Sequence, residues 1–286
     1  MTENSPHIIE DLVEPINLYF HIPVAAKIVT LIKGTSITPN QVTCISVSFG
    51  LAAALGYSMG ELFWFAIAGI MLEISLILDC VDGQLARAKN CSTDWGRLLD
   101  GIGGYVAYVS VMGGLMAGLK GYYYTLIAIT IITILKAILF DYCKLMLNSM
   151  AQQGYDGSQK EIRGAYRKFR EKPSAILKVY FYYLQFQRII FHGKWSSLKK
   201  YSLEFEGNTG ETLLTEPQRN IYYQKNRTLM ALWKWNGHEF VLFLIALFSL
   251  LRVLEESLTI LAYLIGIQLF LTLIIHQFLI RNEIRS

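Results

Sequence analysis

The sequence predicts an all-α membrane protein: a polytopic bundle of six transmembrane helices, preceded by an amphipathic helix at the membrane interface. Of its 286 residues, 53% are hydrophobic and 17% are charged. A soluble domain of this size carries roughly a quarter charged residues. The mean hydropathy is +0.36, and the apolar residues are concentrated in runs long enough to cross a bilayer. These features favour a multi-pass membrane protein over a soluble domain.

The predicted amphipathic helix covers residues 22–34, IPVAAKIVTLIKG. Apolar side chains such as Ile28 and Leu31 fall on one side of it, and Gly34 ends the pattern. A helix of this length rises only about 20 Å, which is too little to cross a bilayer. We therefore expect it to lie on the membrane surface, within an N-terminal cytosolic segment that covers residues 1–35.

The first predicted span opens at Thr38-Pro39-Asn40-Gln41. Thr38 suits the N-cap position, proline suits the first helical position, and Gln41 completes a capping box. The second span is expected to continue as helix beyond its apolar part. The six predicted spans are, in order, about 39–59, 61–78, 96–119, 122–147, 236–253 and 257–280.

Between the fourth and fifth spans lies a polar segment, 151–233. It separates residues 36–150, with four predicted spans, from residues 234–286, with the last two. Extended to Lys234, the polar segment contains 15 Lys and Arg and 7 Asp and Glu, so that its net charge is +8. A polybasic face beside a membrane attracts anionic lipid, which makes membrane lipids expected partners. An ordinary solvated face is the alternative.

The distribution of basic residues predicts the orientation of the chain. With six spans, both termini lie on the same side as the segment 151–233. The three loops on the other side contain only Lys120 and Arg252 of the 26 Lys and Arg. Because the side rich in Lys and Arg is normally cytoplasmic, we expect a multi-pass integral membrane protein with both termini in the cytoplasm.

Carboxylates gather in residues 78–104, LDCVDGQLARAKNCSTDWGRLLDGIGG. Helical spacing places its acidic and small residues on two helix faces: Asp79, Asp82, Gly83 and Ala86 on the first helix, and Gly96 and Asp100 on the second. Since the intervening loop is short, the helices are antiparallel neighbours and the three carboxylates converge at the cytoplasmic end of the bundle. A divalent cation such as Mg²⁺, Mn²⁺ or Ca²⁺ relieves their mutual repulsion. Helix capping at the interface is the alternative.

Together these positions resemble the signature of the CDP-alcohol phosphotransferases, DxxDGxxARx8GxxxDxxxD. The match begins at Asp79, and seven of the eight fixed positions agree in residue and spacing. The resemblance extends to the six spans and to the interfacial helix before the Thr-Pro-Asn opening, but not to residues 151–233. Enzymes of this family move a substituted phosphate from a CDP-alcohol to an acceptor hydroxyl and release CMP, and they resemble one another in being homodimers.

The resemblance implies a role for each matching residue. Asp79, Asp82 and Asp100 would ligate the metal, Mg²⁺ or Mn²⁺, in a two-metal site. The nucleotide of the donor would bind at Asn40, Asp79, Asp82, Gly83, Ala86, Arg87 and Gly96. The implied function is a membrane transferase of phospholipid or related lipid or polyol-phosphate biosynthesis. Its donor would be a CDP-alcohol such as CDP-diacylglycerol, and its acceptor an alcohol, a polyol phosphate or a lipid. No nucleic-acid partner is expected.

The sequence departs from the signature at Gly104, where the family has its last aspartate. That aspartate is thought to act as the general base and to help hold the second metal. Glycine can do neither, so the sequence leaves the catalytic base unknown. The acceptor's own phosphate takes the proton, or the chain is a catalytically impaired paralogue or variant that binds CDP-alcohol and metal, or the base comes from elsewhere. The candidates for such a base are Glu73, Asp141, His238 and Glu239.

Lys136 and Lys144, on the fourth predicted span, are the candidates for an acceptor pocket. They are eight residues apart, and Lys136 lies well inside an apolar run, so that it should face the bundle interior. Pairing of Lys136 with Glu73 and of Lys144 with Asp141 are the alternatives. His276, on the last span, is expected to be a packed or hydrogen-bonded residue and not a ligand.

A rival class of function is a cation transporter that uses the three aspartates and Lys136 as its pathway. Two features argue against it. The acids cluster at one end of the bundle and not at its midplane, and the sequence contains no visible inverted repeat.

Overall fold

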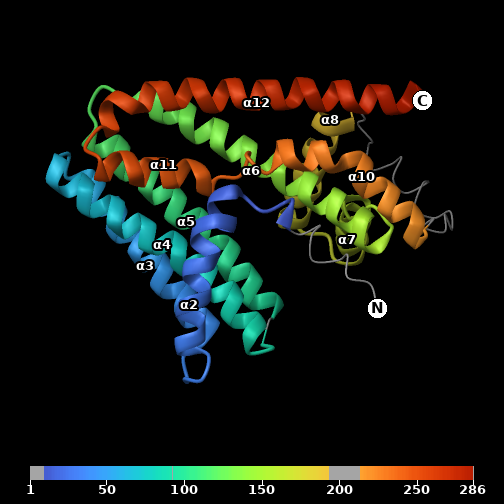
Figure 1. Cartoon of the computed structure of the whole chain (residues 1–286), viewed down its shortest axis with the longest axis horizontal. Coiled ribbons are helices and arrows are strands. Elements are labelled where there is room, and N and C mark those ends of the chain that lie inside the picture. The colour runs from blue at the N-terminus through green and yellow to red at the C-terminus, as the bar shows by residue number, and fades with distance from the viewer. Residues whose placement is uncertain (1–9, 92, 193–212, 286) are drawn as a thin grey trace. The chain divides into compact units, whose positions relative to one another are not determined.

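The computed structural model describes residues 10–91, 93–192 and 213–285, and the secondary structure in these ranges is helical throughout (Figure 1). The all-α prediction is therefore confirmed. The chain divides into two compact units. We call Val13–Lys136 with Trp235–Phe270 the motif unit, because it contains residues 78–104. Ala137–Lys234, with both chain ends, forms the second unit. Residues 1–9 of the predicted N-terminal segment lie outside the described ranges.

The motif unit is built from apolar helices. They are η1 (Asn17–His21), α2 (Ile22–Ile32), α3 (Pro39–Ser58), α4 (Leu62–Ala88), α5 (Asp94–Gly118) and α11 (Glu239–Leu250), together with the first parts of α6 (Tyr123–Gln153) and α12 (Leu254–Arg285). Helix α4 runs without a break from its apolar part through the acidic motif, as predicted.

Helix α2 occupies the predicted amphipathic segment, and the structure shows which of its residues pack against the protein. Ala25 and Val29 are buried against Val81 of α4, with Ile28 partly buried beside them. Leu31, expected on the same face, is 79% exposed. The contact with α4 determines which face of α2 is buried, and the spacing of apolar residues within α2 alone cannot predict it.

The predicted capping box at the start of α3 is confirmed, and the structure adds a capping threonine at the start of α5. The Thr38 hydroxyl accepts a hydrogen bond from Gln41 N at 3.3 Å, and Gln41 Oε1 accepts one from Thr38 N at 2.8 Å. This reciprocal pair is a capping box, which satisfies two otherwise free donors at the start of α3. At the start of α5, Thr93 Oγ1 accepts from Gly96 N at 3.0 Å.

Helix α3 packs closely against both α4 and α5. Ser46 of α3 and Ser75 of α4 each donate to the other's carbonyl oxygen at 2.8 Å. Tyr57 of α3 is fully buried, and its hydroxyl is 2.9 Å from the Ser249 hydroxyl of α11. These polar contacts between helices satisfy backbone and hydroxyl groups that lipid cannot.

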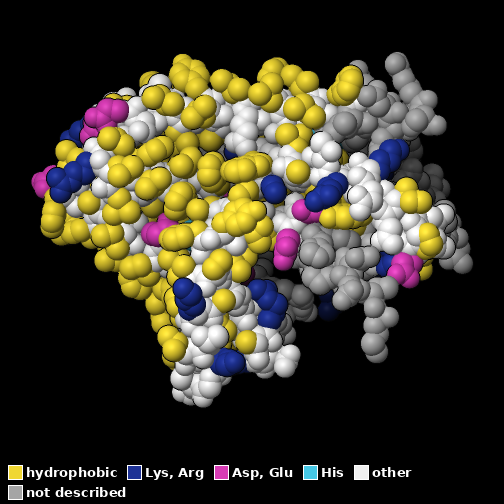
Figure 2. Space-filling model, in the orientation of Figure 1, with side chains coloured by type: hydrophobic (Ala, Val, Ile, Leu, Met, Phe, Trp, Pro, Cys, Tyr) yellow, Lys and Arg dark blue, Asp and Glu magenta, His cyan; other side chains and the backbone are white. Residues whose placement is uncertain are grey.

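Five helical segments are long and apolar enough to cross a membrane: Pro39–Ser58, Leu62–Ala88, Leu99–Gly118, Tyr123–Gln153 and Leu254–Phe278. The chain is thus a multi-pass membrane protein. Hydrophobic side chains also cover much of the visible surface of the motif unit (Figure 2). Among them are Leu55, Phe63 and Tyr263, which are 66%, 62% and 70% exposed. Large exposed apolar side chains of this kind are what lipid contact requires.

The predicted span over 236–253 differs from the structure. Its helix, α11, has 12 residues and rises about 18 Å, less than the thickness of the hydrocarbon core. A turn and a bend over residues 234–238 precede it, and Arg252, with a φ of 60°, follows it. These two turns shorten the helix within an apolar run of spanning length, and α11 packs against α4.

The second unit contains the described part of the predicted polar segment 151–233, and this part is helical. Its helices are α7 (Gly157–Glu171), α8 (Ala175–His192), α10 (Glu216–Trp233) and the later parts of α6 and α12. Ile162 of α7 and Phe181 of α8 are buried in a shared cluster. His276 is buried and accepts a hydrogen bond from Trp233 Nε1 at 3.1 Å, which confirms it as a packed, hydrogen-bonded residue.

Candidate active site

The three predicted metal ligands converge in the motif unit. Asp79 and Asp82 come from α4 and Asp100 from α5, and a carboxylate oxygen of each lies within 4.8 Å of the others. The convergence follows from the helical spacing of the first two residues and from the short turn that reverses the chain between α4 and α5. Two helices thus bring three acids to one point.

The three carboxylates lie close enough that their negative charges would repel one another when all are ionised. Asp82 is only 4% exposed, and Thr43 Oγ1 donates to its Oδ2 at 2.5 Å. A bound cation would balance this negative charge.

The donor set fits a hard divalent cation. Asp79, Asp82 and Asp100 offer only carboxylate oxygens, which Mg²⁺ and Mn²⁺ prefer over sulfur ligands.

Thr43 was not identified from the sequence as a residue of the site. It is a buried hydroxyl inside the first apolar run, and its only signal is a polar side chain one turn after the capping box.

The small residues of the motif lie beside the polar groups predicted to bind the nucleotide. A Cβ at Gly83 would lie 3.7 Å from Nη1 of Arg87, so the guanidinium extends across this glycine. A Cβ at Gly96 would lie 3.2 Å from Oδ1 of Asn40, which brings the start of α5 against the start of α3. Ala86 is half-buried on α4. Gly83 thus lies beside Arg87, and Gly96 lies beside Asn40.

Gly104 leaves open space in α5. A Cβ at this position would meet no atom within 4 Å, although one at the preceding Gly103 would lie 2.7 Å from Cγ2 of Val47. A side chain at position 104 is therefore sterically possible.

The candidate replacement bases are in different settings. Glu73 and Glu239 belong to a polar network in the motif unit, and His238 is the N-cap residue of α11. Asp141 belongs to the second unit.

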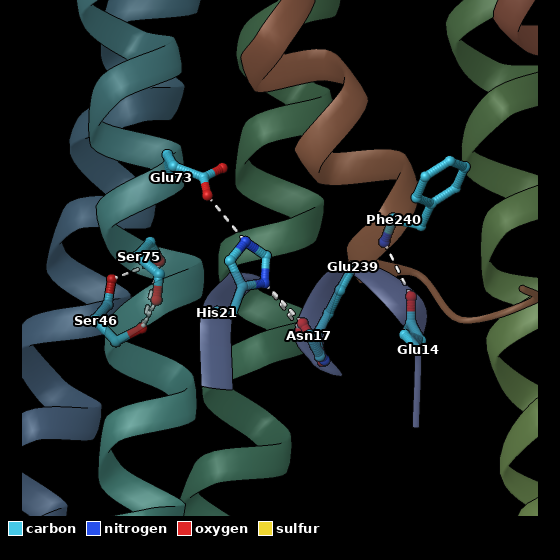
Figure 3. A network of polar contacts seen from close by, with 8 residues as sticks. All are labelled: Glu14, Asn17, His21, Ser46, Glu73, Ser75, Glu239 and Phe240. Atoms are coloured by element: carbon cyan, nitrogen blue, oxygen red, sulfur yellow. Dashed lines mark hydrogen bonds and ion pairs between the residues drawn. The ribbon is translucent and has the colours of Figure 1, made fainter. Parts of the chain in front are cut away.

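His21 is the centre of this polar network (Figure 3). Its ring is fully buried, with Nε2 2.9 Å from Glu73 Oε1 and Nδ1 2.6 Å from Asn17 Oδ1. Glu239 Oε2 is 3.9 Å from Nδ1. Figure 3 shows Glu73, from α4, and Glu239, from α11, on opposite sides of the ring. Sequence reasoning missed the N-terminal members, although Glu14, Asn17 and His21 are polar residues at helical spacing.

The two candidate lysines of α6 have different environments. Lys136 is fully buried, and its Nζ donates to Gln268 Oε1 at 2.8 Å. Glu73 Oε1 is bonded to His21, and Glu73 Oε2 has no hydrogen-bond partner in the described part of the chain, so the alternative pairing of Lys136 with Glu73 is not formed there. Lys144 is exposed, with its Nζ 5.8 Å from the centre of the Phe140 ring. An acceptor pocket that includes both lysines stays a prediction.

Comparison with known proteins gives a match to the family model described as CDP-alcohol phosphatidyltransferase, over residues 36–188. A bifunctional IPC transferase and DIPP synthase of Aquifex aeolicus is 38% identical over 65 residues, 23% of this chain and 14% of the relative. An archaetidylinositol phosphate synthase of Pyrococcus horikoshii is 33% identical over 82 residues, 29% of this chain and 42% of the relative.

A phosphatidylinositol phosphate synthase of Streptomyces avermitilis is 33% identical over 79 residues, 27% of this chain and 31% of the relative. The chain thus spans less than half the length of each of these three relatives.

Proposed function

Because the chain belongs to the CDP-alcohol phosphatidyltransferase family, we propose that it transfers a substituted phosphate from a CDP-alcohol to an acceptor hydroxyl and releases CMP. The observation that carries this proposal is the convergence of Asp79, Asp82 and Asp100 from two helices, with carboxylate oxygens within 4.8 Å of one another. Such a set of hard ligands suits the chemistry of a pyrophosphate.

Each residue of the site has a proposed task. Asp79, Asp82 and Asp100 hold Mg²⁺ or Mn²⁺, which when bound offsets the negative charge of the pyrophosphate and of the leaving CMP. Arg87, whose guanidinium extends across Gly83, pairs with a phosphate oxygen of the donor. The acceptor oxygen forms a bond to the phosphorus that carries the alcohol, and the bond from that phosphorus to the CMP oxygen breaks.

We propose a polyol phosphate as the first acceptor to test. The reported relatives are named as synthases of inositol-phosphate lipids or as IPC transferase and DIPP synthase. A phosphorylated acceptor calls for a cationic side chain inside the bundle, and Lys136 is the buried candidate in the motif unit.

A second candidate function rests on Gly104. A chain without the last aspartate of the signature would bind CDP-alcohol and metal but turn over poorly, because general base catalysis contributes roughly 10²- to 10⁴-fold. This candidate predicts tight binding of CDP and Mn²⁺ without CMP release.

The test is CMP release by the purified chain in lipid nanodiscs, with Mg²⁺ or Mn²⁺. CDP-diacylglycerol is the donor, and a panel of free and phosphorylated polyols supplies the acceptor. We expect one acceptor to give CMP together with a new lipid product. Asp82→Asn should lower the rate at least about a hundredfold, because even changes around the ligands of a metal cost about 10- to 100-fold. Binding of CDP and Mn²⁺ without CMP from any acceptor would favour the second candidate.

A further inference from the structure

Glu239 is a buried carboxylate with an unused oxygen. It is the first residue of α11, its side chain is 17% exposed, and its Oε2 is buried without a hydrogen-bond partner among the described residues. Placing a carboxylate oxygen out of contact with water costs free energy unless the oxygen is hydrogen-bonded, paired or bound to a cation. His21 Nδ1 is 3.9 Å from this oxygen, which is too far for a hydrogen bond, so the oxygen can still act as a ligand of a cation.

Glu239 approaches the turn of α4 that carries Asp79. One of its carboxylate oxygens is within 4.8 Å of Cys80 Sγ, and Cys80 directly follows Asp79 on α4. A fourth acid, far away in the sequence, thus lies beside the first turn of the motif.

The start of α11 is held in place by a contact from the N-terminal segment. Glu14 Oε2 accepts a hydrogen bond from Phe240 N at 3.0 Å (Figure 3). The same carboxylate occupies the space that a side chain at Gly237 would take. Because this contact fixes the first turn of α11, the position of Glu239 is set by the fold and not by a flexible loop.

Glu73 is less suited to the same task. It is six residues before Asp79 on α4, about 9 Å away along the helix axis. Its Oε1 is held by His21 at 2.9 Å, and its Oε2, like that of Glu239, is buried without a hydrogen-bond partner among the described residues, so that distance from Asp79 is what separates the two carboxylates. It therefore provides a matched control, a carboxylate of the same network beside the same histidine.

We propose that Glu239 supplies the fourth carboxylate of the metal site, in place of the aspartate that the family signature has at position 104. This inference rests on the proposed function and extends it, since it assigns the ligand that the motif lacks. It also accounts for the unused oxygen of Glu239 and for the tolerance of a glycine at position 104.

The experiment counts bound Mn²⁺ by electron paramagnetic resonance in nanodiscs, without donor or acceptor. The wild-type chain should bind Mn²⁺ at two sites, as a two-metal centre does. Glu239→Gln should lose the second site and keep the first, which also shows that the variant is folded. Glu73→Gln should keep both sites.

The decisive variant combines Glu239→Gln with Gly104→Asp. Position 104 has room for a side chain, and it lies one turn after Asp100 on α5. The introduced aspartate should therefore restore the second Mn²⁺, which it cannot do if Glu239 only supports the packing of α11.

Two results would overturn the inference: a wild-type chain with a single Mn²⁺ site, or a Glu239→Gln variant that keeps both sites. CMP release by such proteins would leave the proposed function standing. Conversely, a wild-type chain that loses its second Mn²⁺ with Glu239→Gln, but releases no CMP with any acceptor, would support the inference and contradict the proposed transferase activity.

Discussion

The environment of Asp82 depends on one hydroxyl from another helix, that of Thr43. The Thr43 bond to Oδ2 is 2.5 Å long, and the aspartate is almost completely buried. Removal of the hydroxyl leaves the carboxylate without this partner and free to rotate away from the other ligands. We expect Thr43→Val to weaken Mn²⁺ binding by roughly tenfold, the lower end of the usual effect of second-layer contacts. Calorimetric titration with Mn²⁺ measures the change.

Thr43→Ser is the control for this prediction. It keeps the hydroxyl and removes one methyl group, so its Mn²⁺ affinity should stay close to that of the wild type. Equal weakening in both variants would show that Thr43 acts through packing and not through its bond to Asp82.

The spacing of residues in the sequence was enough to predict those site residues that lie close together along the chain. Asp79 and Asp82 are one turn apart on α4, and the short connection to α5 brings Asp100 to them. Thr43 and Glu239 could not be found in this way. Each reaches the site from a different helix, and their approach depends on how α3 and α11 pack against α4.

At the scale of the helices, the crossing of α3 and α5 depends on glycine. A Cβ at Gly114 would overlap the carbonyl oxygen of Ala54, whereas one at the adjacent Gly113 would meet no atom within 4 Å. Because a backbone atom cannot move aside as a side chain can, Gly114→Ala should separate the helices. We expect a loss of about 1–3 kcal/mol in the free energy of unfolding, the usual cost of overpacking. Thermal unfolding in detergent tests this.

Gly113→Ala is the matched control, one position away on the same helix. It should leave the unfolding temperature unchanged or raise it slightly, because alanine is a better helix former than glycine. An equal loss in the two variants would mean that the close approach of α5 to Ala54 does not limit the packing.

The helices themselves were largely predictable. The capping box at Thr38 and the uninterrupted helix through the acidic motif depend on local signals, and both are as expected. Helix α11 is the exception, because hydropathy measures the length of an apolar run and not where the helix within it ends. The turn and bend over residues 234–238 and the left-handed conformation of Arg252 set those ends. The inward face of α2 also depended on its partner, α4.

At the scale of the whole molecule, charge is distributed unevenly along the chain. The segment 151–234 has a net charge of +8, whereas the whole chain has +4. We propose that this segment and the aspartate site face the cytoplasm, where Lys and Arg are normally retained. This orientation would give the site direct access to a water-soluble nucleotide product such as CMP.

Cysteine labelling of intact cells tests this orientation, and the structure determines which positions to use. Gly60 has a φ of 72°, and a Cβ at Gly157 would overlap Ser149 Oγ, so cysteine at either position would disturb the fold. The exposed neighbours Glu61 and Lys160 are better choices. The native Cys44 and Cys91, both exposed, should first be replaced by serine to provide an unlabelled background.

A membrane-impermeant maleimide should label Glu61→Cys in intact cells and Lys160→Cys only after the membrane is permeabilised. The physical reason is the position of the loops. Residue 61 belongs to a loop with no Lys or Arg, and residue 160 starts the basic part of the chain. The reverse pattern would place the basic segment outside. Labelling of both residues in intact cells would contradict the predicted arrangement, because residues on the same side of a membrane are separated by an even number of spans and not by the three predicted between residues 61 and 160.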